Sequence, residues 1–82
     1  MDFDKYFAKT PATLDEITVR VTHALQRHPL CRNIEFEIVG VPRTARGRNW
    51  TISLHAVEPA ALFEASDIVS DIQDAYVLTA AA

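Results

Sequence analysis

Two short segments with alternating hydrophobicity constrain the fold of this chain more than any other feature. Residues 34–39 read Ile-Glu-Phe-Glu-Ile-Val, and residues 50–57 read Trp-Thr-Ile-Ser-Leu-His-Ala-Val. Alternation with a period of two is typical of a β-strand that buries one face. A polar loop, residues 40–49, joins the two segments. Strands that keep one solvated face and are joined in this way favour an antiparallel hairpin, so we predict one here.

The segment that precedes the hairpin has the pattern of an amphipathic helix. Thr13 and Glu16 have the T-x-x-E spacing of a capping box, and Thr10-Pro11 offers an alternative start. Residues 17–21 also alternate as a strand would, but the capping signals and the apolar spacing that continues beyond them favour a helix. Pro29 ends this helix no later than the residue before it. The predicted apolar face consists of Leu14, Ile17, Val21, Ala24 and Leu25.

The segment after the hairpin predicts a longer helix over residues 59–78, about 30 Å long at roughly 1.5 Å per residue. Glu58-Pro59 places a proline in its first turn. One side of this helix is acidic and is either a solvated face or a docking surface for a basic partner; it carries Glu64, Asp67, Asp71 and Asp74. The other side is an apolar stripe, which we predict to form a helix-packing or dimer surface; it consists of Leu62, Ala65, Val69, Ile72 and Tyr76.

These elements predict the α+β class, with a two-layer helix-strand-strand-helix order in which an antiparallel β-hairpin packs on two helices. The 82 residues are expected to form one domain, with residues 1–9 as an N-terminal arm or turn and residues 80–82 as a frayed tail. A two-stranded sheet is marginal by itself, and both of its strands have unpaired edges. We therefore expect dimerisation to complete the fold, either by joining hairpins or by pairing helices.

Composition narrows the classes of protein that remain. Cys31 is the single cysteine, so an intrachain disulfide is excluded. The first residues lack the pattern of a secretory signal, and no apolar run reaches the roughly 20 residues that a membrane-spanning helix needs. We expect a cytoplasmic protein with no membrane partner. The net charge of −3 disfavours a general nucleic-acid or anionic-membrane binder.

The loop at the predicted hairpin tip concentrates positive charge. Arg43, Arg46 and Arg48 lie within six residues, with Gly47 among them. Guanidinium groups bind phosphates in a bidentate manner, so this loop is a candidate anion or nucleic-acid contact. Trp50 could stack on a base, although its register places it with the core residues. The alternative, which we favour, is a solvated loop whose arginines pair with acids of the same subunit or of a partner subunit.

The sequence gives little support for a metal site, a bound cofactor or a reactive cysteine. The histidines and the cysteine of the chain, His23, His28, Cys31 and His55, do not have the spacing of a known zinc site. Cys31 follows a predicted helix end, where the helix dipole disfavours a thiolate. A packed, inert thiol therefore fits the sequence better than a nucleophile partnered by His28 or His55. We expect no metal site and no cofactor.

The polar faces of the two strands offer one candidate catalytic group. Glu35 and Glu37 share a strand face, and the neighbouring strand presents Thr51, Ser53 and His55. An open two-stranded face offers no pocket, however, and cross-strand pairing is the simpler role for these side chains. We therefore expect no catalytic residues.

The sequence as a whole favours a small non-enzymatic protein–protein interaction module that forms a homodimer, with an unidentified protein partner as a further expectation. The alternative is a nucleic-acid-binding accessory protein that contacts phosphates through Arg43, Arg46 and Arg48. A third hypothesis, a small enzyme that uses Glu35, Glu37 and His55, has the least support.

Overall fold

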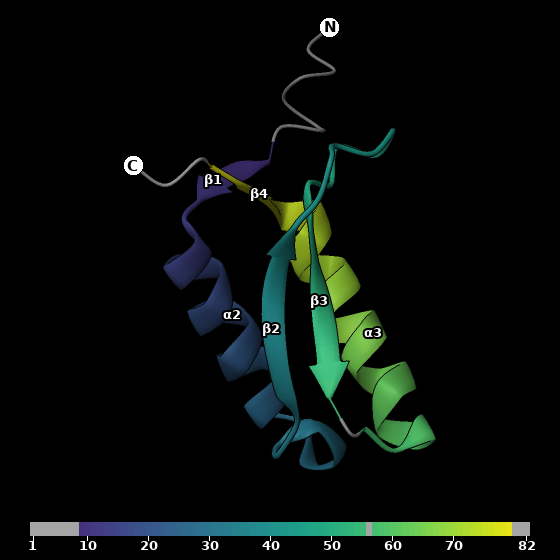
Figure 1. Ribbon diagram of the computed structural model, residues 1–82. Coiled ribbons are helices and arrows are strands. Elements are labelled where there is room, and N and C mark those ends of the chain that lie inside the picture. Colours follow the sequence, from purple (N-terminus) through teal and green to yellow (C-terminus); the bar gives the residue numbers. More distant parts are fainter. Residues whose placement is uncertain (1–8, 56, 80–82) are drawn as a thin grey trace, which may run out of the picture.

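The computed structural model describes residues 9–55 and 57–79 of the chain. The segments predicted as an N-terminal arm or turn, apart from Lys9, and as a C-terminal tail therefore lie outside the described residues. Two helices, an antiparallel hairpin and a short parallel strand pair make up a small α+β fold (Figure 1). In chain order the elements are β1 (Thr10–Ala12), α2 (Leu14–Gln26), the 3₁₀ turn η1 (Pro29–Cys31), β2 (Glu35–Gly40), β3 (Trp50–His55), α3 (Pro59–Ala75) and β4 (Tyr76–Leu78).

The predicted hairpin is confirmed. β2 and β3 pair antiparallel, with Phe36 opposite Leu54 and Ile38 opposite Ile52, so the apolar side chains of the two strands meet on one face. Both helices lie on that side of the hairpin, α2 beside β2 and α3 beside β3 (Figure 1). β3 ends at His55, two residues before the end of the predicted strand.

The predicted first helix is confirmed, and the structure decides between its two starts. Thr13 is the N-cap and forms a complete capping box with Glu16, whereas Thr10-Pro11 belongs to β1. The hydroxyls of Thr18 and Thr22 each donate to the carbonyl four residues earlier, so the β-branched stretch satisfies its own polar groups within the helix. α2 ends at Gln26, and a 3₁₀ turn follows from Pro29.

The prediction that the last helix runs to residue 78 is wrong. α3 ends at Ala75, and Tyr76–Leu78 form β4, which pairs in parallel with β1. The helix stops where one distant segment, β1 with Lys9 directly before it, provides other partners for its backbone. Lys9 Nζ donates to the carbonyls of Gln73 (3.2 Å) and Asp74 (2.8 Å), which are otherwise left open at a helix C-terminus. Tyr76 is therefore a strand residue, and the guanidinium of Arg20 lies 5.3 Å from its ring centroid.

The core forms between the helices and the apolar face of the hairpin. Trp50, Ile17 and Ala65 are completely buried. Partly buried side chains of both strands pack against this centre, including Phe36 and Ile52. Neither helix in the described part of the chain combines the length and the apolar character that crossing a bilayer requires.

The side chain of Asn49 joins the hairpin to the parallel strand pair. Its Nδ2 donates to the carbonyl of Leu78 (2.7 Å), and its Oδ1 accepts from the Leu78 amide (2.9 Å). The amide of Asn49 thus replaces the neighbouring strand that β4 lacks on this side. A Cβ at Gly40 would lie 3.5 Å from Leu78 Cδ2, an ordinary van der Waals contact, so the packing here does not require glycine.

We expect Asn49→Ala to lower the free energy of unfolding by about 1–3 kcal/mol, since it leaves two partly buried backbone groups of Leu78 without partners. Urea unfolding followed by the fluorescence of Trp50 measures this loss. Asn33→Ala, at an exposed position, is the matched control. Equal unfolding midpoints for the two variants would show that the Asn49 bridge does not stabilise the fold.

Candidate interaction surface

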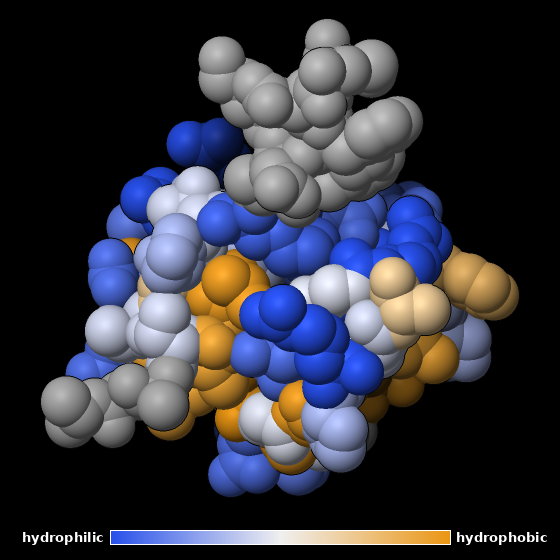
Figure 2. Space-filling view, turned by 90° about the horizontal axis from the view of Figure 1, so that it is seen from above, coloured by the Kyte–Doolittle hydropathy of each residue, from blue (hydrophilic) through white to orange (hydrophobic). Residues whose placement is uncertain are grey.

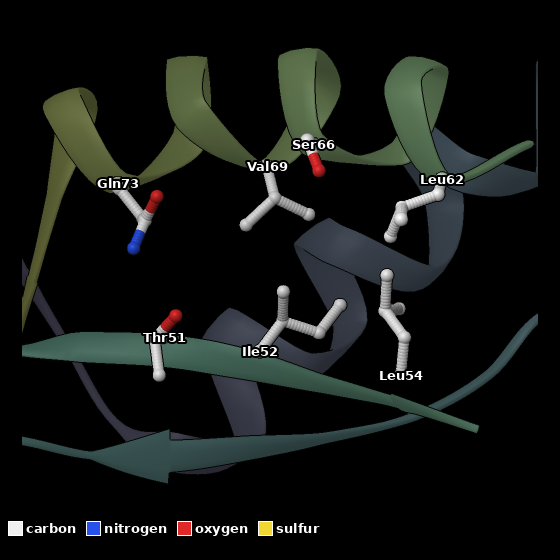
Figure 3. Close-up of a pocket in the computed structure, with 7 residues that line it drawn as sticks. All are labelled: Thr51, Ile52, Leu54, Leu62, Ser66, Val69 and Gln73. Atoms are coloured by element: carbon white, nitrogen blue, oxygen red, sulfur yellow. The ribbon is translucent and has the colours of Figure 1, made fainter. Parts of the chain in front are cut away.

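An open groove of about 310 Å³ lies between β3 and α3. Figure 3 shows Ile52 and Leu54 of β3 extending towards Leu62 and Val69 of α3 across this space. The polar side chains of the groove are Thr51, Ser66 and Gln73. The groove is polar at the end formed by Thr51 and Gln73 and mostly apolar towards Leu54 and Leu62 (Figure 3), and none of its lining side chains is charged.

Phe63, one residue from this groove, is the most exposed large apolar side chain in the described part of the chain. It is 75% exposed, and its neighbour Leu62 is 45% exposed. Sequence reasoning missed Phe63 because it lies outside the three-four spacing of the apolar stripe, among polar positions. An aromatic residue off the stripe of an amphipathic helix is the one signal that would have found it.

The predicted apolar stripe is used mostly within the subunit. Ala65 and Val69 are buried in the core, and Ile72 packs against it. Tyr76 lies in β4 instead of in the helix. Of the predicted helix-packing residues, Leu62 alone is counted among the exposed large apolar side chains.

The structure does not bring the three arginines of the loop together as one site. Arg48 turns back onto α3 and is held by Asp74 Oδ1 (2.7 Å from Nη2 and 2.9 Å from Nε) and by Ser70 Oγ (2.8 Å from Nη2). Arg46 lies at the edge of the same contact, with Nη2 3.9 Å from Asp74 Oδ2, and its side chain is 73% exposed. Arg43 is exposed at the tip.

The loop is an extension of the hairpin. The Val41 amide donates to the carbonyl of Asn49 (2.9 Å), and the Thr44 amide donates to the carbonyl of Arg48 (2.8 Å). Gly47 closes the turn with a φ of 82°, a conformation that favours glycine. Figure 2 looks down on the end of the molecule that carries this loop and shows hydrophilic residues gathered there, with hydrophobic residues visible between them.

Trp50 is not available for stacking on a base. Its side chain is completely buried, and its indole Nε1 donates to the carbonyl of Tyr76 (3.1 Å). The side-chain amide of Gln73 in turn donates to the carbonyl of Trp50 (2.7 Å). Trp50 therefore helps to hold β3 against the end of α3.

The candidate catalytic residues lie on the exposed face of the hairpin. Glu35 is directly opposite His55, and Glu37 is opposite Ser53. The distance from His55 Nε2 to Glu37 Oε2 is 3.9 Å, with both side chains more than half exposed. This arrangement is that of cross-strand pairs, and neither glutamate nor His55 lines the groove.

Cys31 is 1% exposed, and its thiol contacts the carbonyl of Ala61 (3.8 Å). Burial raises the pKa of the Cys31 thiol, and the nearby Glu64 carboxylate raises it further, so the unreactive protonated form is favoured. Glu64 also pairs with His28, with 3.2 Å between Oε2 and Nε2. No group of three or more metal-binding side chains gathers within the described ranges.

The contact between Arg48 and Asp74 makes stability depend on pH in the acid range. The hydrogen bond from Arg48 and the charges of Arg48, Arg46 and Lys9 hold the pKa of Asp74 below its ordinary value of 3.8. Because this pKa is lower in the folded state, the carboxylate stabilises the fold above its ordinary pKa. That contribution is lost as the pH falls through the lowered value.

We expect Asp74→Asn to lower the Tm at about pH 7 and to reduce the fall in Tm between about pH 7 and pH 2.5. Thermal unfolding by circular dichroism at a series of pH values measures both effects. Asp71→Asn removes an exposed carboxylate from the same helix and serves as the control. The same pH dependence in both variants would contradict a stabilising role for the Arg48–Asp74 contact.

No protein-family model, curated protein or solved structure matches this chain. The features of the surface itself therefore carry the functional argument. Those features are one protruding phenylalanine and the uncharged groove beside it.

Proposed function

We propose that this protein is a non-enzymatic protein–protein interaction module that acts as a homodimer. The observation that carries the proposal is the exposure of Phe63 and Leu62 beside the open groove of α3 and β3. Burying one such apolar side chain contributes roughly 1.5–3 kcal/mol, which is a large gain for a contact of small area. Aromatic side chains at the centre of a contact are also the usual source of binding energy between proteins.

The small sheets support the same proposal. Within the described residues, each of the two sheets has two strands, β1 with β4 and β2 with β3. Small sheets of this kind depend on packing against other elements, and here α2 and α3 cover one side of the hairpin. A second subunit would add to this cover at the side of the hairpin where β3 and α3 leave the groove open.

The exposed face of the hairpin gives little support to catalysis. His55, Glu37 and Glu35 extend into solvent, where no enclosed space would orient a substrate or exclude water. Their separation and exposure suit a solvated surface that keeps the hairpin soluble.

Two of the residues considered for a nucleic-acid contact are not available for one. Arg48 is engaged with Asp74 and Ser70, and Trp50 is buried. Arg43 and Arg46 remain exposed, but Glu35 and Glu37 on the same hairpin would repel a phosphate backbone. The homodimer therefore has the stronger support.

We expect the native chain to show a reversible, concentration-dependent rise in sedimentation coefficient between about 1 and 300 µM. Phe63→Ser should weaken dimerisation roughly 100- to 10,000-fold, because each dimer buries two copies of this aromatic side chain. Leu30→Ser is the matched control, because Leu30 is 53% exposed on η1 and does not line the groove.

Two results would overturn this proposal. One is a native chain that stays monomeric over the whole range of concentration. The other is a native dimer whose affinity Phe63→Ser and Leu30→Ser change equally. Because Phe63 is largely exposed within the subunit, its replacement should leave the unfolding midpoint of the monomer unchanged.

A further inference from the structure

Helix α3 carries an exposed aromatic side chain and also forms one wall of the groove. Phe63 projects from the first half of α3, and the groove beside the same helix extends from Leu62 to Gln73. Val69, near the middle of the α3 side of the groove, lies six residues after Phe63, about 9 Å along the helix axis. A surface with both features can pair with a second copy of itself about a two-fold axis. In such a pair, the exposed side chain of each copy enters the groove of the other.

We propose that two copies pair antiparallel along α3 and that Phe63 of each copy fills the groove of the other. This inference rests on the proposed homodimer and states its geometry. A two-fold axis that exchanges positions 63 and 69 crosses α3 at Ser66. Ser66 is small and exposed, so it permits the usual interaxial distance of about 8–10 Å between packed helices. A parallel arrangement would place the two Phe63 side chains together and leave both grooves empty.

The charges at the two ends of α3 are complementary in this arrangement. Arg46 lies beside Asp74 at the C-terminal end of α3, and Figure 1 shows the loop close to that end. Glu58 is the exposed N-cap residue at the other end, and no side-chain cap bond involves it. A two-fold axis at Ser66 places position 74 of one copy opposite position 58 of the other. The guanidinium of Arg46 therefore faces the carboxylate of Glu58 across the interface.

An internal ion pair reduces the repulsion between two acidic helices. Arg48 neutralises Asp74 within each subunit. The accessible side chains at the centre of the groove, Ser66 and Ile52, carry no charge, and neither does the inserted Phe63. The main cost of pairing α3 with its own copy is thus confined to exposed acids away from the groove.

The competing geometry pairs two subunits through the edges of their hairpins. At the β2 edge, this pairing is opposed by repulsion between like charges. A second β2 placed beside the first would bring Glu35 and Glu37 close to their own copies, and like charges across strands are destabilising. The edge of β3 carries Thr51 and Ser53 and lacks this defect. The experiment therefore has to distinguish α3 pairing from β3 pairing.

Symmetric cysteine cross-linking makes this distinction. Under mild oxidation we expect Ser66→Cys to form a disulfide-linked dimer, because residues on the two-fold axis of closely packed helices come within the roughly 4.4–6.8 Å between Cα atoms that a disulfide needs. Ser53→Cys on β3 and Asp71→Cys on the acidic side of α3 should remain unlinked. The natural Cys31 is buried and should not compete.

A charge exchange tests the register independently. Arg46→Glu should weaken dimerisation about two- to thirtyfold, the effect of two symmetry-related surface ion pairs, and Glu58→Arg should do the same. The double variant Arg46→Glu/Glu58→Arg should recover the native dimer affinity, which sedimentation velocity measures. Arg43→Glu with Glu58→Arg is the matched control, and this pair should show no recovery.

The results separate this inference from the proposed function. A native dimer in which Ser53→Cys is linked and Ser66→Cys is not would overturn the α3 pairing while the homodimer stands. Linkage at Ser66 without recovery in the double charge variant would overturn the antiparallel direction of the pairing and its contact between Arg46 and Glu58. A chain that stays monomeric would overturn both proposals.

Discussion

Residues 48–50 attach the hairpin to the end of α3 and to β4, and the arrangement of both layers depends on this attachment. Arg48 bonds to Asp74 and Ser70 of the helix, and Asn49 bonds to both backbone groups of Leu78. The indole of Trp50 reaches the carbonyl of Tyr76. These bonds occupy backbone groups at a helix end and a strand that would otherwise lack partners, and leaving such groups unpaired is costly. They hold the base of the loop on α3 while the apolar face of the hairpin closes on the core.

The same attachment decides which features remain available to a partner. It withdraws Arg48 and Trp50, two of the residues that had been considered for a nucleic-acid contact. It also brings Gln73 against the carbonyl of Trp50, so that α3 meets β3 closely at one end of the groove. Phe63 remains uncovered at the other end of the helix. The interaction surface thus follows from the way in which one end of the hairpin is attached.

Local patterns predicted the hairpin and the first helix well. The pairing of Phe36 with Leu54 follows from alternation on both strands, and the capping box of Thr13 follows from a spacing of three residues. The end of α3 was not predictable in this way. Residues 76–78 continue the helical spacing, but β1, more than sixty residues earlier in the chain, supplies a parallel strand for them. The proposed contact residues show the same division, since the apolar stripe was visible in the sequence but the exposure of Phe63 was not.

The sequence by itself determined the kind of each main element: two half-buried strands and two amphipathic helices, because periodicity and capping act between residues only a few positions apart. Only the tertiary structure decided which side chains those elements leave uncovered. Val69 and Leu62 belong to the same predicted stripe, yet one is 2% exposed and the other 45% exposed. The difference arises because burial depends on which distant segments pack over each position, and no local spacing in the chain specifies that cover.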